Sequence, residues 1–456
     1  MTENRHDSQP QPLTARAGNR LSGTIAVPGD KSISHRAAMF GLLAVGETCV
    51  DGLLEGEDVR NSIAAIRKLG GHAERDGTGI WRINGVGIGG LCEPDSVLEM
   101  GNSGTSVRLL MGLAGGHPIR TTFTGDASLH RRPMARVATP LGMMGIDCAG
   151  RQGMRLPITV TGPQELLPIR YELPVASAQV KSAILLAGLS AAGVTEIIEP
   201  EPTRDHTETM LRHMGADISS EKLPGGGQII RLSGQPELRP AHFTVPGDPS
   251  SAAFPIVAAL LTPGADVTVT NVCINPLRAG LFACLAEMGA DISLENQRRA
   301  GGETIADITA RGSALKAIAP PPERAASMID EYPILAIAAA CAEGTSSLRG
   351  LAELRVKESD RLAAMAQGLS ACGVKVTELE DGLVIEGRGG TATPIPGGAT
   401  IATQMDHRIA MSFLVAGLAA KSPVTVDDSR MIATSFPDFV SLMHGLGASI
   451  ETIEAS

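Results

Sequence analysis

A sixfold internal repeat constrains the fold of this chain more than any other feature. Six Leu-Gly, Met-Gly or Cys-Gly pairs recur at intervals of 70 to 84 residues, each after an amphipathic helical pattern and before a short β-like run. Glycine in that place is typical of a helix C-terminus, because it tolerates left-handed backbone. The glycines are Gly70, Gly145, Gly215, Gly289, Gly373 and Gly447.

A second series of six short helical patterns interleaves with the first. These patterns are apolar on nearly every face, and a helix of that kind is buried. The two series together predict an α/β unit of about 70–80 residues that is used six times. The buried helices are expected at Ala37–Val45, Val107–Ala114, Ser182–Ala191, Ala252–Leu261, Pro333–Cys341 and Ile409–Ala420.

Two similar segments predict where the chain crosses between domains. The sequence V-P-G-D at 27–30 recurs at 245–248. We therefore expect a three-repeat domain over 28–246 and a second, discontinuous three-repeat domain made of 20–27 plus 247–456. Residues 1–19 are polar and contain two prolines, so we expect a disordered N-terminal tail there rather than a signal peptide.

Composition excludes several classes of partner. A net charge of −10 and an aromatic content of 2% predict neither the positive surface nor the stacking side chains of a nucleic-acid-binding protein. The charge also disfavours an anionic membrane surface, and apolar runs stop near 12 residues, which is too short to span a bilayer. The seven cysteines are scattered and form no CxxC pair, so we expect reduced, buried thiols and a cytoplasmic protein.

Polar motifs stand at or just before the starts of the six buried helices. Ser, Asp and Asn there are explained by ordinary helix capping. Positive charge at a helix start is electrostatically disfavoured, and an anionic ligand bound at these helix ends would remove the conflict. The motifs are Lys31–Arg36, Asn102–Ser106 with Arg108, Ser177–Lys181, Asp248–Ser251, Asp330–Tyr332 and Asp406–Arg408. The surplus cations are Lys31, Arg36, Arg108, Lys181 and Arg408.

Three further charged stretches leave alternatives open. The stretch 355–361, R-V-K-E-S-D-R, reads either as a solvated helix start capped by Ser359 or Asp360, or as a proton-transfer group, with Lys357 and Arg361 at helical i,i+4 spacing. Arg131-Arg132 reads as a surface loop or an anion clamp. The stretch 203–206, T-R-D-H, opens a helix that we expect to be exposed, with Asp205 as its cap and Arg204 left over.

The absence of several sequence motifs narrows the chemistry. The chain contains no G-x-x-x-x-G-K-[ST] phosphate loop, no convincing dinucleotide fingerprint, no H-E-x-x-H or paired Cys/His set, and no G-x-S-x-G elbow. The residues therefore predict a two-domain α/β enzyme that binds a small, multiply anionic substrate and needs no metal or cofactor.

The motifs resemble those of the 5-enolpyruvylshikimate-3-phosphate synthase family, in order and over nearly the whole chain. The matching stretches are PGDKSISHR (28–36), GNSGTSVR (101–108), HRRPM (130–134), SAQVKSA (177–183), TRDH (203–206), VPGDPSS (245–251), DEYP (330–333), RVKESDR (355–361) and DHRIAMSF (406–413). SAQVKSA and IDEYP are similar to the bacterial class II members, which are often insensitive to glyphosate.

The resemblance implies a fold and an activity. The fold would be a two-domain inside-out α/β barrel, with three βαβαββ-type repeats in each domain. The activity would be transfer of the enolpyruvyl group of phosphoenolpyruvate to the 5-hydroxyl of shikimate 3-phosphate, with release of phosphate. We expect a monomer with these two small-molecule substrates, no cofactor, no metal, no nucleic acid and no membrane partner.

The resemblance also implies the site residues. Asp330 would accept the 5-hydroxyl proton, Lys31 and Glu358 would protonate and deprotonate the enol methylene, and Lys357 completes the catalytic set. Shikimate 3-phosphate would be held by Lys31, Ser32, Arg36, Ser177, Gln179, Arg204, Asp330 and Lys357. Phosphoenolpyruvate would be held by Lys31, Gly104, Arg132, Gln179, Arg361 and Arg408.

The chain departs from the family's patterns at three positions. Ala178 replaces a serine of other members, and Thr434 replaces a lysine that many members carry. Gly104 stands where several glyphosate-insensitive members have alanine, so we expect room for this inhibitor.

Two rival functions fit the sequence less well. A UDP-N-acetylglucosamine enolpyruvyl transferase would carry Lys-Asn early and a loop cysteine, whereas Ser32 follows Lys31 here. A non-catalytic repeat scaffold would have helix starts poor in cations.

Overall fold

The computed structural model describes residues 9–224, 226–389 and 394–452. The chain forms two compact units, each with its own hydrophobic core. Unit 1 consists of the described residues within Met1–Val27, Gly247–Gln297 and Ala306–Ser456. Unit 2 contains Pro28–Pro246 and the hairpin tip Arg298–Ile305.

Unit 2 contains three four-stranded sheets, and the second shows the repeat most plainly. Its strand order is β6-β7-β9-β8, in which β6 runs parallel to β7 and the other pairs are antiparallel. A parallel pair needs a crossover connection, and a helix supplies it. The elements are β6 (Leu98–Glu99), α3 (Gly104–Gly115), β7 (Arg120–Thr124), α4 (Ala127–Arg131), α5 (Ala135–Met143), β8 (Asp147–Arg151) and β9 (Arg155–Thr161).

The other two repeats of unit 2 follow the same βαβαββ order. The third contains β10 (Arg170–Glu172), α6 (Ala178–Gly188), β11 (Val194–Glu199), α7 (His206–His213), β12 (Ile218–Lys222) and β13 (Gln228–Ser233). The first contains α1 (Lys31–Leu43), β3 (Val45–Asp51), α2 (Glu57–Lys68), β4 (His72–Arg75) and β5 (Trp81–Val86). Its parallel edge strand is β14 (His242–Thr244), which comes from the far end of the unit and so closes it.

Unit 1 repeats the pattern with strands borrowed from the N-terminus. Strand β2 (Ser22–Ala26) is the parallel edge of the sheet β16-β17-β15-β2, and β1 (Leu13–Arg16) lies between β24 and β25 in another. The first repeat continues with α8 (Pro249–Leu261), β15 (Asp266–Cys273), α9 (Gly280–Glu287), β16 (Asp291–Ala300) and β17 (Glu303–Arg311). The second contains the 3₁₀ helices η2 (Pro322–Ser327) and η3 (Ile329–Glu331), then α10 (Tyr332–Cys341), β18 (Thr345–Leu348), η4 (Ala352–Val356), α11 (Arg361–Ala371), β19 (Lys375–Leu379) and β20 (Gly382–Glu386). The third contains β21 (Ile395–Gly397), β22 (Thr400–Ile401), α12 (His407–Leu418), β23 (Ala420–Ser422), β24 (Val424–Val426), η5 (Arg430–Thr434), α13 (Phe439–Gly445) and β25 (Ser449–Thr452).

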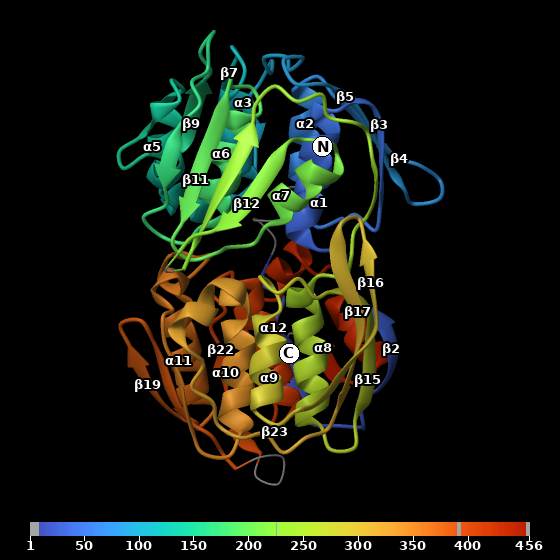
Figure 1. Cartoon of the computed structure of the whole chain (residues 1–456). Coiled ribbons are helices and arrows are strands. Elements are labelled where there is room, and N and C mark those ends of the chain that lie inside the picture. The colour runs from blue at the N-terminus through green and yellow to red at the C-terminus, as the bar shows by residue number, and fades with distance from the viewer. Residues whose placement is uncertain (1–8, 225, 390–393, 453–456) are drawn as a thin grey trace. The chain divides into compact units, whose positions relative to one another are not determined.

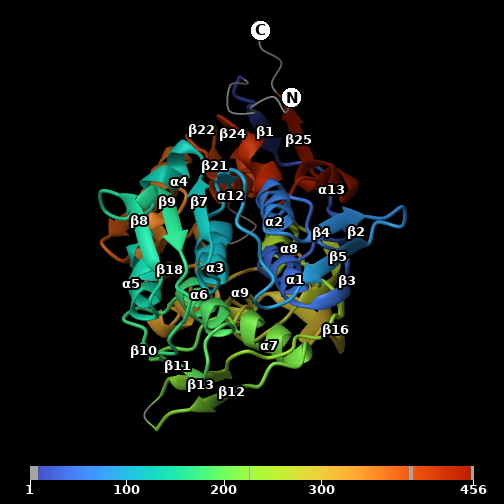
Figure 2. The ribbon, with the colours of Figure 1, turned by 90° about the horizontal axis from the view of Figure 1, so that it is seen from above.

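The apolar helices lie inside each unit and the sheets lie outside, as the inside-out fold predicts. In unit 2, α1, α3 and α6 pack together and the three sheets surround them (Figure 2). In unit 1, α8, α10 and α12 pack on one another in the same way (Figure 1). Every residue of α8, α10 and α12 is buried, so these helices need no polar face.

The helix predictions are confirmed in number and place but not at their ends. All six buried helices begin earlier than predicted, and five of them follow directly on a capping side chain such as Asp30 or Ser103. Helix α1 ends at Leu43, and Val45 starts β3 instead. All six repeat glycines have positive φ, between 77° and 104°, which confirms them as helix C-terminal residues.

The predicted disordered tail is wrong for its described part. Strand β1 pairs antiparallel with β24 and β25, and buries Leu13 and Ala15 in the core of unit 1. The polar residues before it, 1–8, lie outside the described residues. A four-residue strand with only two apolar side chains has a weak sequence signal, and only its two distant partners identify it.

Other sequence expectations have mixed outcomes. All seven cysteines are free, but Cys92 is exposed, and Cys49 and Cys148 are only partly buried, so the prediction of buried thiols is wrong for these three. Within the described ranges, no helix has the length and apolar character to cross a membrane. The same residues contain no group of three or more His, Cys, Asp or Glu side chains that could hold a metal ion.

Candidate active site

Helix α1 begins at the glycine turn of the P-G-D-K-S motif. Asp30 is its buried N-cap, and Oδ1 accepts a hydrogen bond from the Ile33 backbone N at 2.9 Å. Lys31 is the first helical residue, and its Nζ lies 3.0 Å from Oδ2 of Asp58 on α2. This carboxylate compensates a charge that the helix dipole disfavours. Asp58 carries no distinguishing sequence signal, because acids are ordinary in the first turn of a helix.

Arg36 lies one turn further along α1 and is held by three elements. Its Nη1 donates to the Ser32 carbonyl at 2.9 Å, its Nε to Thr207 Oγ1 at 2.7 Å, and its Nη2 to Ser182 Oγ at 2.7 Å. Burial lowers the pKa of Arg36 to about 10, which leaves the guanidinium charged at neutral pH. The structure thus brings Ser32 and Arg36 together and joins them to α6 and α7.

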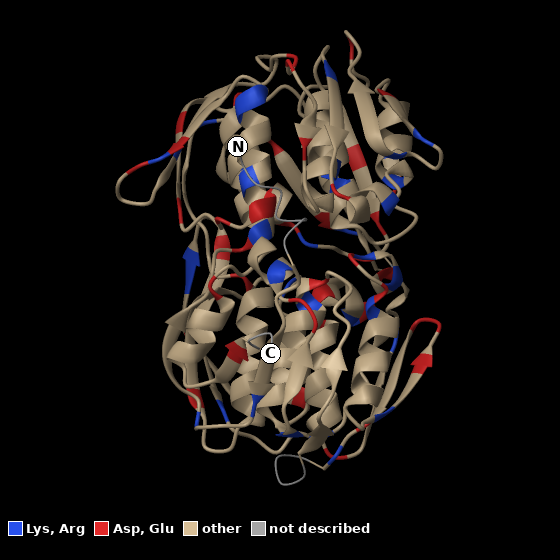
Figure 3. Cartoon of the chain, turned by 180° about the vertical axis from the view of Figure 1, so that it is seen from behind, with Lys and Arg blue, Asp and Glu red and all other residues tan. Residues whose placement is uncertain are grey.

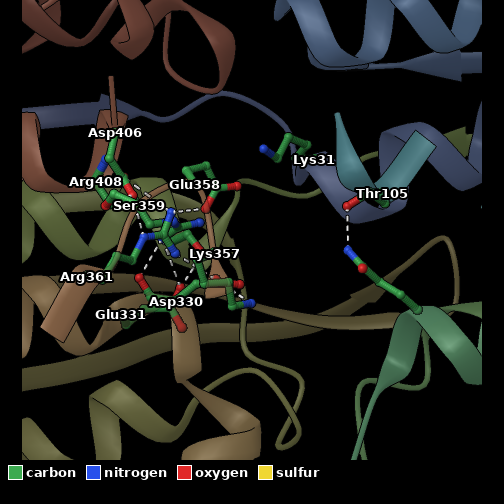
Figure 4. Close-up of polar contacts among 12 residues, drawn as sticks. Lys31, Thr105, Asp330, Glu331, Lys357, Glu358, Ser359, Arg361, Asp406 and Arg408 are labelled. Atoms are coloured by element: carbon green, nitrogen blue, oxygen red, sulfur yellow. Dashed lines mark hydrogen bonds and ion pairs between the residues drawn. The ribbon is translucent and has the colours of Figure 1, made fainter. Parts of the chain in front are cut away.

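The starts of α3 and α6 are joined by side chains on both. Ser103 caps α3, and Ser177 caps α6. Gln179 donates from Nε2 to Thr105 Oγ1 at 2.9 Å, while its Oε1 accepts from Arg108 Nη1 at 2.6 Å (Figure 4 labels Thr105).

Two guanidinium groups flank Gly104. A Cβ there would lie 3.1 Å from Nη1 of both Arg108 and Arg132. Arg132 follows α4 and is nearly buried, and its Nη2 donates to Asn102 Oδ1 at 2.8 Å. The surface-loop reading of Arg132 is therefore wrong. Gly104 leaves open the space between two cations.

The stretch from Thr203 to His206 differs from its prediction. Asp205 stands at the N-cap position of α7, but the first turn of that helix is buried rather than exposed. Arg204 precedes it, partly buried, on the connection after β11. Lys181 is fully buried with the carboxylates of Glu199 and Glu208, so its partners belong to the protein, and the prediction that an anionic ligand compensates it is wrong.

In unit 1, Asp330 is held between cations (Figure 4). Its Oδ1 lies 3.3 Å from Lys357 Nζ and 3.2 Å from Arg361 Nη1. Its backbone carbonyl accepts from Arg408 Nη1 at 2.9 Å. The side chain of Asp330 remains 15% exposed, so a substrate hydroxyl could reach it.

Arg361 is the centre of this cluster. Its Nη2 lies 2.6 Å from Glu358 Oε2, and Nε lies 2.8 Å from Asp406 Oδ2. Burial alone would lower the pKa of Arg361, but Asp406, Glu358 and Asp330 outweigh it and raise the pKa. Asp360 is confirmed as a helix cap, but the helical i,i+4 spacing of Lys357 and Arg361 is wrong, because α11 begins at Arg361 and Lys357 lies before it. The cap breaks the helical register between them.

A buried network behind Asp330 carries no clear sequence signal. The Glu331 carboxylate is 1% exposed; Oε1 accepts from Ser250 Oγ and lies 3.4 Å from Arg408 Nη1. Arg278 Nη2 donates to Asp248 Oδ1 at 2.9 Å, and Arg278 Nη1 lies 3.6 Å from Glu331 Oε1. These contacts join the starts of α8, α10 and α12. Figure 3 shows several charged segments of unit 1 at one end of its largely uncharged helices, and others on its loops and outer strands.

The predicted site residues thus fall into two sets. The first set belongs to unit 2 and lies at or near the starts of its helices: Lys31, Ser32, Arg36, Gly104, Arg132, Ser177, Gln179 and Arg204. Asp330, Lys357, Glu358, Arg361 and Arg408 belong to unit 1, where ion pairs and hydrogen bonds link all five. The unit 2 set has four cations and no carboxylate, which suits anionic substrates, whereas the three cations of the unit 1 set are paired with carboxylates.

Comparisons with known proteins agree with one another. Residues 15–443 match the family model of EPSP synthase (3-phosphoshikimate 1-carboxyvinyltransferase). The chain is 62% identical over 437 residues to the 3-phosphoshikimate 1-carboxyvinyltransferase of Parvibaculum lavamentivorans, and the match covers 96% of each chain. The EPSP synthase structure from Acinetobacter baumannii has a TM-score of 0.86 and 50% identity, covering 97% of this chain and 100% of that one. The enolpyruvyl transferase NikO from Streptomyces tendae shares the fold at 21% identity, with a TM-score of 0.76 and coverage of 98% and 100%.

Proposed function

Because the chain belongs to the EPSP synthase (3-phosphoshikimate 1-carboxyvinyltransferase) family, we propose that it transfers the enolpyruvyl group of phosphoenolpyruvate to shikimate 3-phosphate. The acceptor is the 5-hydroxyl, and phosphate is released. The reaction belongs to the shikimate pathway, which leads to chorismate and the aromatic amino acids. The observation that carries this proposal is the placement of Asp330 between Lys357 and Arg361, with Glu358 on the same arginine.

Enolpyruvyl transfer needs a general acid and a general base, and cations that stabilise the two anionic substrates. In the first step the 5-hydroxyl oxygen bonds to C2 of phosphoenolpyruvate, its proton passes to Asp330, and C3 takes up a proton. In the second step C3 loses a proton, the bond from C2 to the phosphate oxygen breaks, and phosphate leaves. Lys31 and Glu358 are the groups that give and take the C3 proton. Lys357 lies 3.3 Å from Asp330 and keeps a positive charge beside this proton-accepting carboxylate.

The substrate contacts are proposed residue by residue. Shikimate 3-phosphate is held by Lys31, Ser32, Arg36, Ser177, Gln179, Arg204, Asp330 and Lys357. Phosphoenolpyruvate is surrounded by Lys31, Arg132, Gln179, Arg361 and Arg408. Gly104 leaves space for it. Cations held in place by protein carboxylates and amides need little reorganisation when the anions bind.

The wider organisation is proposed on the same basis. Units 1 and 2 correspond to the family's two three-repeat domains, 20–27 plus 247–456 and 28–246. The enzyme acts as a cytoplasmic monomer on small molecules, without a metal or cofactor and without nucleic-acid or membrane partners. Seven free cysteines support a reducing compartment, and the net charge of −10 opposes binding to polyanions.

The first test is phosphate release from phosphoenolpyruvate with and without shikimate 3-phosphate. Wild type should release phosphate only with both substrates, and Lys31→Ala should lose most of this activity. Lys222→Ala, which removes an exposed lysine on β12 of the same unit, is the matched control and should keep it. No release from folded wild type would contradict the proposal, and release without shikimate 3-phosphate would change the reaction class to hydrolysis.

A further inference from the structure

Lys181 is a fully buried lysine that none of the proposed substrate contacts uses. Its Nζ lies 2.8 Å from Glu208 Oε1 and 3.0 Å from Glu199 Oε2, and it donates to the Thr203 carbonyl at 3.2 Å. Burial lowers the pKa of Lys181, but Glu208 and Glu199 outweigh it and raise the pKa, so the ammonium stays charged. A buried charge of this kind is retained only where its contacts are well satisfied.

These contacts converge on the connection between β11 and α7. Residues 200–205 there contain no helix or strand, and Arg204 lies among them. Thr203, the residue before it, is held twice: its carbonyl accepts from Lys181, and its hydroxyl donates to Glu199. Glu199 is itself fixed by Gln228 Nε2 of β13 at 2.7 Å. Lys181 and Glu199 thus set the backbone from which the Arg204 side chain departs.

The same part of α6 also reaches Arg36. Ser182, next to Lys181, accepts from Arg36 Nη2 and lies 2.7 Å from Thr207 Oγ1, which accepts from Arg36 Nε. The side chains of Ser182 and Thr207 are fully buried and that of Arg36 nearly so. Two adjacent residues of α6 therefore orient two arginines, one through a side chain and one through a turn.

We propose that Lys181 is a positioning residue that holds the Thr203–Arg204 turn, so that Arg204 is already placed for shikimate 3-phosphate when the substrate arrives. This inference rests on the proposed function, and it assigns Lys181 no contact with substrate. Pre-ordering a binding group improves affinity, because the cost of ordering it is not taken from the binding free energy. The loss of Lys181 should therefore weaken binding of shikimate 3-phosphate without removing any substrate contact.

The test separates positioning from stability with three variants. Lys181→Met removes the ammonium but leaves two buried carboxylates, so it lowers the melting temperature as well as affinity. Lys181→Met/Glu208→Met also removes one of those carboxylates, and the remaining one, Glu199, keeps its hydrogen bonds from Gln228 and Thr203. Glu208→Gln keeps Lys181 and its bond to Thr203. His117→Ala removes a buried ring hydrogen-bonded to Leu113 and Gly89, after the C-terminal end of α3, and is the stability control.

The readouts are the calorimetric Kd of shikimate 3-phosphate, the KM of each substrate and the melting temperature. Both Lys181 variants should raise that Kd by about tenfold, the effect of one lost hydrogen bond from a charged group. Glu208→Gln and His117→Ala should leave it within about twofold. The double variant should recover melting temperature relative to Lys181→Met but not affinity.

The outcomes distinguish this inference from the function beneath it. If wild type binds shikimate 3-phosphate and the double variant binds equally well, the positioning role is overturned and the proposed function stands. If His117→Ala weakens binding as much as Lys181→Met at equal loss of melting temperature, general destabilisation explains the effect and the inference is again overturned. If wild type does not bind shikimate 3-phosphate, the proposed function fails and this inference fails with it.

Discussion

The guanidinium of Arg361 holds the Asp406 carboxylate at both oxygens, with Nε 2.8 Å from Oδ2 and Nη2 3.3 Å from Oδ1. Both side chains are 1% exposed or less, and the two residues are 45 positions apart in the chain. Burial would raise the pKa of Asp406, but Arg361 outweighs it and lowers the pKa. The carboxylate thus remains charged while it also caps α12 by accepting from the Arg408 backbone N at 2.9 Å.

This pair predicts a large cost for a small change at Asp406. Asp406→Asn removes the negative charge and leaves Arg361 buried with less compensation, so the free energy of unfolding should fall by about 3 kcal/mol. Chemical denaturation measures it. Asp438→Asn is the control, since that side chain is exposed at the start of α13 and makes no capping bond. A loss below about 1 kcal/mol would show that the pair is not essential to folding.

His35 predicts how stability depends on pH. It is fully buried in α1 and hydrogen-bonds Ser62 Oγ through Nδ1 at 2.8 Å. Burial, with Lys31 and Arg36 nearby, lowers the pKa of His35 well below its ordinary 6.5. Below pH 6.5 the imidazole of His35 is therefore protonated in the unfolded chain but stays neutral in the folded chain. The free energy of unfolding thus falls as the pH is lowered below 6.5.

The slope of that loss is measurable. Wild type should lose up to about 1.4 kcal/mol per pH unit from this group below pH 6.5. His35→Asn keeps a donor for Ser62 but cannot titrate, so the gap between the two unfolding free energies should shrink by about 1 kcal/mol from pH 6.5 to 5.5. Denaturant melts at both pH values measure it, and a constant gap would contradict the assigned burial of a neutral imidazole.

Gly104 predicts how the enzyme responds to glyphosate. A methyl group there would meet Nη1 of Arg108 and of Arg132 at 3.1 Å, so both flexible ends would have to give by a few tenths of an ångström. Glyphosate is longer than phosphoenolpyruvate and should suffer more from the lost space. Gly104→Ala should raise its inhibition constant by about tenfold, with a smaller rise in the KM of phosphoenolpyruvate. An unchanged or lower inhibition constant would sink the idea.

Two helical glycines should respond to alanine in opposite directions. In α11, a Cβ at Gly368 would lie 2.2 Å from Phe413 Cζ in a packed core, so Gly368→Ala should cost about 1–3 kcal/mol or more. In α5, exposed Gly142 has nothing within 4 Å of such a Cβ. Gly142→Ala should stabilise by about 0.4–1 kcal/mol, because it restricts the unfolded chain. Thermal unfolding of both variants checks the pair, and equal shifts would refute the packing around Phe413.

Local rules explain what could be predicted of the fold. Three features depend only on residues within a few positions of one another. They are the repeat glycines with positive φ, the buried helices, and the helix caps Asp30, Ser103 and Asp406. Strand β1 could not be predicted, since it is ordered by partners more than 400 positions away. The end of α1 was predicted too late, at Val45, because this residue is apolar and continues the helical pattern. In the structure Val45 is the first residue of β3, and its side chain is exposed.

The order of residues along the chain is enough to establish the sixfold α/β repeat, the motifs at the helix starts and the family to which they belong. The partners of each charge depend on how the chain packs. Lys31 and Lys181 look alike as cations near helix starts, yet one pairs with Asp58 beside the site and the other is buried with Glu199 and Glu208. A cap is a contact within one turn, whereas these carboxylates lie 18 to 27 residues away, and only the packed fold brings them within 3 Å.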